Sequence, residues 1–290
     1  MILILGGTGY VGNAFCEELT RRNVSFRNLS RSEHNYYDLD TLVSLIRDSK
    51  AEFLINAAGY TGKPNVDACE IHKWECLQGN AVLPGIIRDA CELTELPWGH
   101  VSSGCIYTGS NSDGSGFTES DDPNFCFRTN NCSFYSGCKA IGEECLEGAE
   151  NAFVWRLRIP FNHVDSGRNY LSKIMRYQRL LDATNSVSHL DEFVRCCLET
   201  WENRVPFGIY NVTNSGSVTT RRVTELIQSE LSLNQEFDFF DSEEEFMKVA
   251  AKTPRSNCVM DNSKLLSTGI QIRHVEDAIK ESLQTWITET

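Results

Sequence analysis

The stretch Ile2–Gly12, "ILILGGTGYVG", predicts the fold of this chain. A short apolar run leads into Gly6, Gly9 and Gly12, spaced G-x-x-G-x-x-G, and the residues after them have helical periodicity. Glycines at a strand-to-helix turn permit a close approach of the backbone to a phosphate group, and the helix N-terminus adds N–H donors. A glycine-rich turn alone is a weak signal. Between a strand and a helix at this spacing, it indicates a dinucleotide-binding unit.

The rest of the chain alternates between strand-like and helical segments, which is typical of a parallel sheet covered by helices on both faces. We therefore predict an α/β fold, a Rossmann doubly wound parallel sheet with a smaller, intertwined C-terminal substrate lobe. The predicted division assigns residues 1–158, with about 186–213 returning to them, to the dinucleotide-binding domain, and residues 159–185 and 214–290 to the substrate lobe. The predicted strands are residues 2–5, 24–30, 52–59, 99–107, 152–160 and 208–214, the predicted helices are 13–23, 39–49, 67–96, 134–149, 168–181 and 219–231, and a polar loop spans 108–131.

The composition excludes several classes of partner. A net charge of −13 argues against a nucleic-acid-binding protein. The apolar opening is too short for a signal peptide and no apolar run is long enough to cross a bilayer, so we expect a cytoplasmic protein without a membrane partner. The twelve cysteines form no C-x-x-C pair and match no common zinc spacing, so we expect reduced thiols and no metal site. An anionic ligand requires locally gathered basic groups, for which the candidates are Arg156, Arg158, Arg168, Lys173, Arg176, Arg179 and Arg255.

The residues after the second predicted strand bear on which dinucleotide binds. A carboxylate at that place holds a ribose 2′-hydroxyl, whereas an arginine suits a 2′-phosphate. The chain has "NLSRS", with Ser30 and Arg31 and no acid. We therefore expect NADPH, with NADH as the alternative cofactor. A solvated surface arginine is the other interpretation of Arg31.

The segment "FYSGCK" predicts a proton-transfer pair. Tyr135 and Lys139 lie four residues apart, so on a helix they share a face. The ordinary pKa of tyrosine, about 10, is high for proton transfer at neutral pH, and a neighbouring ammonium lowers it. Ser103, at the end of the strand before, is positioned to donate a hydrogen bond to a substrate carbonyl. A Tyr-x-x-x-Lys pair by itself is mostly a coincidental surface pair. With Ser103 roughly thirty residues earlier and the glycine motif, it resembles the Ser…Tyr-x-x-x-Lys arrangement of a known reductase superfamily.

Several stretches resemble a known family: "NAAGYTGKPNVDACEIHKWE", "GCIY", "GFTESDDPNF", "SFYSGCKA", "RLRIP", "RNYLSKIMRY" and "PRSN". With them the chain resembles the extended short-chain dehydrogenase/reductases and, more narrowly, the dTDP-4-dehydrorhamnose reductase group. Within that group it is most similar to the bifunctional 3,5-epimerase/4-reductases of UDP-L-rhamnose synthesis. The stretches are scattered over nearly the whole chain. "NAAGYTGKPNVD" and "RNYLSKI" are the specific ones, whereas the glycine and Tyr–Lys motifs mark only the superfamily.

The resemblance implies roles for the matching residues. In this family the cysteine after the catalytic hydroxyl is implicated in epimerisation, so we expect Cys105 as base and Lys173 as acid in the inversion of C3 and C5 of a 4-keto-6-deoxyhexose. Without the resemblance, Cys105 is more often buried filler and Lys173 an exposed helix residue. Together with the motifs above, the resemblance gives three sets of expected site residues. The catalytic residues are Ser103, Tyr135, Lys139, Cys105 and Lys173. The cofactor-binding residues are Gly6, Thr8, Gly9, Tyr10, Val11, Gly12, Arg31, Ala57, Ala58, Gly59 and Lys139, and the substrate-binding residues are Thr61, Asn65, Asp67, Asn162, Arg168 and Arg255.

The function that the resemblance implies is conversion of UDP-4-keto-6-deoxy-D-glucose to UDP-L-rhamnose with NADPH. The 4-keto substrate is expected from a separate 4,6-dehydratase, and a homodimer is expected by analogy with relatives. Two alternatives stay open: a 4-ketorhamnose reductase without epimerase activity, and a non-catalytic NADP-binding regulatory subunit. Cys105 and Lys173 weigh against the first alternative, and the intact Ser103, Tyr135 and Lys139 weigh against the second.

Overall fold

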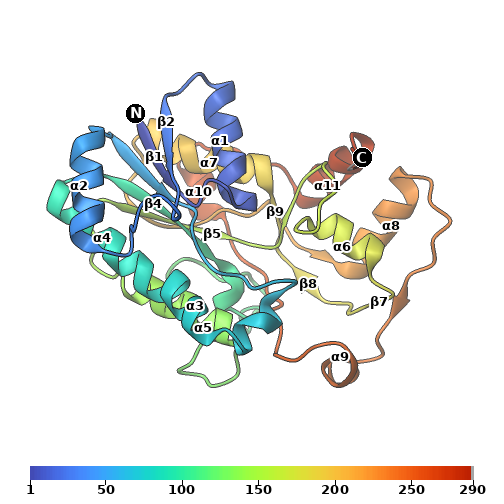
Figure 1. The fold of residues 1–290 in the computed structure, drawn as a ribbon. Helices are drawn as coiled ribbons and strands as arrows, with labels where there is room; N and C mark the ends of the chain where they lie inside the picture. The colour runs from blue at the N-terminus through green and yellow to red at the C-terminus, as the bar shows by residue number, and fades with distance from the viewer. Residues whose placement is uncertain (289–290) are drawn as a thin grey trace.

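The structure, a computed structural model, describes residues 1–288 and is built around a six-stranded parallel sheet (Figure 1). The strand order is β10-β5-β4-β3-β1-β2. The chain runs from β1 outward to β2 and then crosses to β3 on the other side of β1, so the strand order reverses there. Ligands of such sheets bind at the carboxyl ends of the strands beside this reversal. The strands are β1 (Ile2–Leu5), β2 (Phe26–Leu29), β3 (Phe53–Asn56), β4 (Trp98–Ser103), β5 (Ala152–Leu157) and β10 (Gly208–Asn211).

Helices cover both faces of the sheet, as Figure 1 shows. On one face, α1 and α7 pack over a core that contains Phe15, Trp155 and Phe193. On the other face, α2 and α4 pack over a second core that contains Leu42 and Ile87. Because both faces of the sheet are buried, the strands are continuous apolar runs in the sequence. The predicted α/β fold with a parallel sheet is confirmed. The helices of this part are α1 (Tyr10–Arg21), α2 (Leu39–Ser49), α3 (Lys73–Leu77), α4 (Leu83–Thr94), α5 (Phe134–Glu144), α7 (Leu190–Glu202) and α10 (Ser263–Ser267).

A smaller group of elements lies beside the carboxyl edge of the sheet, on the right of Figure 1. Its own core contains Phe161, Ile227 and Ile279. The chain returns from this group to the large sheet, where β10 pairs with β5. The predicted domain boundaries remain a prediction. The elements of the group are α6 (Tyr170–Arg176), α8 (Thr220–Glu230), α9 (Glu243–Val249) and α11 (Val275–Gln284), with the short strands β6 (Pro160–Phe161), β7 (Arg179–Leu180), β8 (Thr184–Asn185), β9 (Ser188–His189), β11 (Val218–Thr219) and β12 (Asp238–Phe239).

The long helix predicted at 67–96 is divided in the structure. A 3-10 helix at Val66–Glu70 comes first, and α3 then continues through a π-helical turn at Gln78–Val82 into α4. The last helix ends at Thr94 because Glu95 adopts a left-handed conformation, with φ of +53°. The division matters for function because the 3-10 helix contacts the candidate site.

The helix predicted at 168–181 is also shorter in the structure. It ends at Arg176, and the chain continues into β7, which pairs with β12. Strand pairing and the burial of Leu180 outweigh the helical periodicity of this segment. The strand predicted at 152–160 ends at Leu157, and Ile159 has a positive φ of +37°.

Two further observations concern composition. Within residues 1–288, the helices are all too short or too polar to span a bilayer. All twelve cysteines are free thiols and nine are buried, as expected of reduced core cysteines.

Candidate active site

The turn after β1 has the backbone geometry that the glycine motif predicts. Gly6 has a positive φ of +80°, and its carbonyl accepts a hydrogen bond from the N–H of Gly9 at 2.9 Å. A Cβ on Gly12 would collide with the Gly6 carbonyl, so only glycine fits where α1 crosses the turn. Gly9 caps α1 without a side-chain hydrogen bond, which leaves the N–H groups of the first turn available to an anion. This turn fits the pyrophosphate of a dinucleotide.

The loop after β3 lies against this turn. The N–H of Ala57 donates to the carbonyl of Leu5 at 2.9 Å, and a Cβ on Gly6 would meet the backbone of Ala57 and Ala58. Gly59 continues the loop toward the Lys139 ammonium. The sheet therefore brings together the predicted cofactor residues that follow β1 and β3.

The remaining predicted cofactor residues lie at the same edge. Arg31 comes two residues after the end of β2 and is exposed, as a residue that meets a ribose phosphate must be. Thr8 is exposed in the glycine turn, and Val11 is half-buried in α1. Tyr10 points toward the other lobe, since its hydroxyl lies 3.5 Å from Oδ1 of Asn162.

Ser103, Cys105 and Tyr135 meet where β4 ends and α5 begins. Ser103 is the last residue of β4, and its hydroxyl accepts a hydrogen bond from the N–H of Cys105 at 3.2 Å. The same hydroxyl lies near the Tyr135 hydroxyl and the Cys105 thiol. Tyr135 is held in the first turn of α5, which Ser133 caps. The structure thus brings three of the five predicted catalytic side chains close together.

Lys139 follows one turn along α5. Its side chain is buried, and its Nζ donates to the carbonyl of Val101 in β4 at 3.3 Å. Gly59 lies beside the same Nζ. The ammonium is therefore positioned between β4 and the loop that carries the predicted cofactor residues.

Burial sets the protonation of Tyr135. Desolvation raises the pKa of its hydroxyl well above the ordinary value, the thiol of Cys105 adds to this, and the hydrogen bond with Ser103 opposes it. The expected lowering of the Tyr135 pKa by Lys139 is wrong for this structure, because desolvation outweighs the favourable contacts. Tyr135 is protonated at neutral pH, which is the form that a proton donor requires.

The two residues expected to exchange protons with the sugar also have shifted pKa values. Burial raises the pKa of the Cys105 thiol, although hydrogen bonds with Ser103 and Ser136 oppose the shift. Burial, and then the positive charge of Arg168, lower the pKa of Lys173 in α6. A protonated thiol can act as an acid, and a lysine with a lowered pKa is more often in the neutral form that a base requires. These directions are opposite to the roles expected from the sequence.

Four of the predicted substrate-binding residues pair with one another. The Arg168 guanidinium donates from Nη1 to the Thr61 hydroxyl at 3.1 Å and from Nη2 to the carbonyl of Gly62 at 2.9 Å. The Arg255 guanidinium forms an ion pair with Asp67, in which Nη1–Oδ1 is 2.7 Å and Nη2–Oδ2 is 2.8 Å. The loop after β3 therefore contacts both arginines expected to bind the substrate.

The two predicted asparagines are engaged within their own turns. The side chain of Asn65 accepts a hydrogen bond from the N–H of Asp67 at 2.9 Å and caps the 3-10 helix, which is the turn-forming role. Oδ1 of Asn162 accepts from the N–H of Val164 at 3.2 Å and from Nδ2 of Asn169 at 3.0 Å. Neither side chain is aimed freely into the site.

The basic residues considered from the sequence as an anion-binding patch differ in burial and in their partners. Most of these residues either form an ion pair with a carboxylate or are buried. Among the residues that the structure describes, 1–288, only Arg168 and Lys173 of this set are neither paired with a carboxylate nor buried. The ion pairs are Arg156–Glu143, Arg176–Asp165, Arg179–Glu245 and Arg255–Asp67, and Arg158 is buried with hydrogen bonds to Asn185 and the Ser256 carbonyl.

Glu143 is a site residue that the sequence reasoning missed. It lies one turn beyond Lys139 on α5, accepts hydrogen bonds from Ser102 at 2.5 Å and from Arg156 at 2.7 Å, and is almost wholly buried. Its charge opposes the lowering of the Lys139 pKa that burial causes. The regular spacing of Tyr135, Lys139 and Glu143 along one helix face is the signal that could have identified it.

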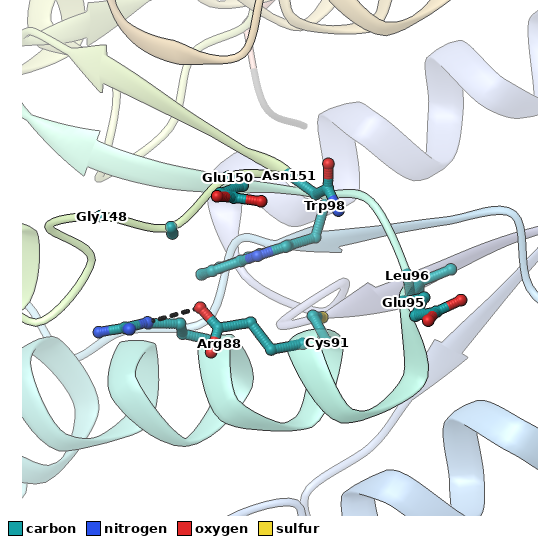
Figure 2. A pocket seen from close by; sticks show the side chains of 10 residues that line it. Arg88, Cys91, Glu95, Leu96, Trp98, Gly148, Glu150 and Asn151 are labelled. Atoms are coloured by element: carbon teal, nitrogen blue, oxygen red, sulfur yellow. Dashed lines mark hydrogen bonds and ion pairs between the residues drawn. The ribbon is translucent and has the colours of Figure 1, made fainter.

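A surface pocket of about 630 Å³ lies at the other end of the sheet (Figure 2). It contains Trp98, the first residue of β4, whereas Ser103 is the last; at a rise of about 3.3 Å per residue the two are about 17 Å apart. Arg88 and Glu92, which both line it, form an ion pair at 2.8 Å. The pocket is separate from the candidate site. It is lined by Arg88, Cys91, Glu92, Glu95, Leu96, Trp98, Gly148, Ala149, Glu150 and Asn151.

The chain is similar to several curated proteins of Arabidopsis thaliana. It is 32% identical to the bifunctional dTDP-4-dehydrorhamnose 3,5-epimerase/dTDP-4-dehydrorhamnose reductase over 292 residues, which cover 99% of this chain and 92% of that protein. It is also 32% identical to the trifunctional UDP-glucose 4,6-dehydratase/UDP-4-keto-6-deoxy-D-glucose 3,5-epimerase/UDP-4-keto-L-rhamnose-reductase RHM3 over 282 residues, 96% of this chain and 41% of that protein. The chain spans about two fifths of the length of the trifunctional relatives.

Solved structures share the fold. The L780 UDP-rhamnose synthase of Acanthamoeba polyphaga mimivirus has a TM-score of 0.89 and 23% identity, covering 98% of each chain. The dTDP-4-dehydrorhamnose reductase of Bacillus anthracis, in complex with NADP, has a TM-score of 0.81 and 17% identity over 98% of this chain and 97% of that one.

A family model matches almost the whole chain. Residues 1–287 match the RmlD substrate binding domain. The resemblance to dTDP-4-dehydrorhamnose reductases found in the sequence is confirmed, and the chain belongs to the RmlD substrate binding domain family.

Proposed function

We propose that the protein is a bifunctional 3,5-epimerase/4-reductase that converts UDP-4-keto-6-deoxy-D-glucose to UDP-L-rhamnose with NADPH. The observation that carries the proposal is the proximity of Ser103, Cys105 and Tyr135 at the carboxyl end of β4. The names of the relatives that match this chain over most of its length support the same pair of reactions. Deuterium exchange at C3 and C5 before reduction tests it.

The reduction requires a hydride at C4 and a proton at the C4 oxygen. NADPH, when bound along the glycine turn, supplies the hydride. Ser103 donates a hydrogen bond to the C4 oxygen, and Tyr135 gives it the proton, which its raised pKa keeps available at neutral pH. Lys139, beside Gly59, is near enough to the predicted cofactor loop to orient the nicotinamide ribose. The proton and hydride together convert the ketone to the alcohol.

The epimerisation requires a base and an acid on opposite faces of the sugar ring. The hydrogens on C3 and C5 lie next to the C4 ketone, so removal of either gives an enolate whose charge lies on the C4 oxygen. Ser103 and Tyr135, which donate hydrogen bonds to this oxygen in the reduction, also stabilise the enolate. We assign Lys173 as the base that removes the proton and Cys105 as the acid that returns one from the other face, because their pKa values are shifted in those directions. This reverses the expectation from the sequence.

The proposed substrate implies the reaction that supplies it. A 4-keto-6-deoxy sugar nucleotide is the product of a 4,6-dehydratase, the first activity in the name of the trifunctional relatives. We infer that such a reaction supplies this protein, and we expect it to act in the cytoplasm as a homodimer.

One observation favours a second candidate function. Cys105 is only 6% exposed and its pKa is raised, as for an inert core thiol. A 4-ketorhamnose reductase that receives an already epimerised substrate needs Ser103, Tyr135 and Lys139 alone. The two candidates differ only in whether C3 and C5 exchange their hydrogens.

Arg31 tests the choice of cofactor. We expect Arg31→Ala to raise the KM for NADPH about 10- to 100-fold, because a charge-assisted contact with the 2′-phosphate is lost, and to leave the KM for NADH unchanged. Arg27→Ala is the matched control, since the Arg27 guanidinium lies 3.4 Å from His34 instead. Steady-state kinetics with both cofactors measure the effect. An equal change for NADPH and NADH would mean that Arg31 does not read the 2′-phosphate.

Arg168 tests the assignment of Lys173 as base. A base acts when neutral, so the deuterium-exchange rate at saturating substrate should rise with pH through the lowered pKa of Lys173. Arg168→Ala removes a positive charge that lowers this pKa, so the pKa rises and the profile moves to higher pH. Arg168→Lys retains the charge and should leave the profile close to that of the wild type. Profiles recorded between about pH 6 and 10 that do not move in Arg168→Ala would contradict the assignment.

A further inference from the structure

The loop after β3 contacts two segments that are remote in sequence. Near its end, the 3-10 helix Val66–Glu70 presents two carboxylates, Asp67 and Glu70. Asp67 pairs with Arg255, 188 residues away, through both guanidinium Nη atoms. This pair is mostly buried, with side-chain exposures of 15% for Asp67 and 22% for Arg255.

Glu70 joins the same distant segment to the helix of the proton donor. Its Oε1 accepts a hydrogen bond from the N–H of Phe134 at 2.8 Å and another from the Thr253 hydroxyl at 2.8 Å. Phe134 is the first residue of α5, directly before Tyr135. An N–H in the first helical turn has no partner within the helix, so an acceptor from outside fixes the position of that turn.

The segment from Thr253 to Cys258 crosses the site next to Cys105. The hydroxyl of Ser256 donates to the carbonyl of Tyr107 at 2.6 Å, and the Cys258 thiol lies 3.3 Å from the Gly104 carbonyl. The carbonyl of Ser256 accepts from Arg158. We call residues 253–258 the strap. Its contacts extend along the loop that carries Cys105, while its first residues are held by Asp67 and Glu70.

We propose that Asp67 and Glu70 are positioning residues for the proposed reaction, on which this inference rests. Asp67 orients Arg255 for the diphosphate of the sugar nucleotide, and Glu70 fixes the first turn of α5 so that Tyr135 meets the C4 oxygen. One short helix thereby links the segment that holds the substrate to the residue that protonates it.

The chemistry of each contact supports a positioning role. A guanidinium has five N–H donors, and its one hydrogen bond to Asp67, from Nη2, leaves other donors for phosphate oxygens. The hydrogen bond from Nη2 and the ion-pair contact of Nη1 with the same carboxylate hold the guanidinium against Asp67, while Nη1 itself is buried without a hydrogen-bond partner. Glu70 does not touch Tyr135 itself. It acts through the backbone of Phe134, and a displacement of about 1 Å of a reacting group can cost about 100-fold in rate.

The two carboxylates are expected to affect different kinetic constants. Glu70→Ala should lower kcat for the reduction of UDP-4-keto-L-rhamnose about 10- to 100-fold with a small change in KM, because the proton donor is misplaced. Asp67→Ala should raise KM about 10-fold or more with a smaller change in kcat, because the arginine is no longer oriented. Glu70→Gln and Asp67→Asn each keep an acceptor oxygen in place and should recover most of the lost function.

The experiment compares these four variants with wild type and with Glu75→Ala, an exposed carboxylate on α3 that makes no hydrogen bond within the described residues. Full-length proteins are assayed for kcat and KM with NADPH, for NADPH affinity by fluorescence, and for melting temperature. The split between kcat and KM, with unchanged NADPH affinity and recovery by Gln and Asn, supports the inference.

Three results would overturn it. Glu70→Ala and Asp67→Ala could behave as Glu75→Ala does. Alternatively, both could lower kcat, substrate affinity, NADPH affinity and melting temperature together, which is a structural effect only. A wild type without turnover overturns the proposed function and this inference with it, whereas an active wild type with unaffected variants overturns the inference alone.

Discussion

Tyr135→Phe is expected to abolish the reduction of the C4 ketone while leaving the exchange of the C3 and C5 hydrogens in place. The phenol is the group that delivers a proton to the C4 oxygen, and loss of such an acid costs about 10²- to 10⁴-fold in rate. The raised pKa of Tyr135 means that the wild-type residue is protonated throughout the neutral range, so this loss should not depend on pH there.

Exchange should persist because it needs the enolate and not the alcohol. Ser103 remains to donate a hydrogen bond to the C4 oxygen in the variant, so we expect the exchange rate to fall by about 10- to 100-fold, the loss of one hydrogen bond to a developing charge. Tyr177→Phe, which removes an exposed hydroxyl after α6, is the matched control. NADPH oxidation with UDP-4-keto-L-rhamnose and deuterium exchange measured on the same preparation separate the two activities. A Tyr135→Phe protein that still reduces the ketone would remove Tyr135 from the mechanism.

Cys105→Ala is expected to give the opposite pattern. The thiol is the proposed acid for returning a proton to C3 or C5, so exchange should fall about 10²- to 10⁴-fold. Reduction of an already epimerised substrate should remain close to the wild-type rate, since Ser103, Tyr135 and Lys139 are intact. The variant loses one sulfur atom from a buried position, which should cost only about 1 kcal/mol of stability.

Cys258→Ala controls for the removal of a buried thiol in the same place. Cys258 is fully buried and its thiol packs on the carbonyl of Gly104, the residue before Cys105. If Cys258→Ala slows exchange as much as Cys105→Ala does, the effect is one of packing. If neither variant slows it, Cys105 is core filler and another residue exchanges protons with the sugar.

The parts of the site that depend on local spacing could be predicted from the sequence. The glycine turn follows from three glycines between a strand and a helix, and the shared face of Tyr135 and Lys139 follows from helical geometry. Ser103, at the end of the strand before that helix, was expected to donate a hydrogen bond to the substrate carbonyl, and in the structure it lies near Tyr135.

Other parts depend on contacts between remote segments, and the sequence contains no local signal for them. The pairing of Asp67 with Arg255 and the contact of Glu70 with Phe134 join residues 188 and 64 positions apart. The short α6 depends on the pairing of β7 with β12. A single chain offers no periodicity that encodes such partners.

Protonation states were the least predictable feature. The Lys139 ammonium was expected to lower the pKa of Tyr135, and Cys105 was expected as a thiolate base. Both pKa values are raised, because both side chains are desolvated where β4 meets α5. The magnitude of desolvation depends on packing in three dimensions, whereas a sequence indicates only which charges are near.

The most direct test of the central claim is NMR of the wild-type protein with UDP-4-keto-6-deoxy-D-glucose in deuterated buffer, first without NADPH and then with it. The bifunctional account predicts deuterium at C3 and C5 before NADPH is added and UDP-L-rhamnose afterwards. Absence of deuterium at both carbons, together with NADPH-dependent reduction of UDP-4-keto-L-rhamnose, would contradict the account and leave a 4-reductase in which Cys105 is part of the core.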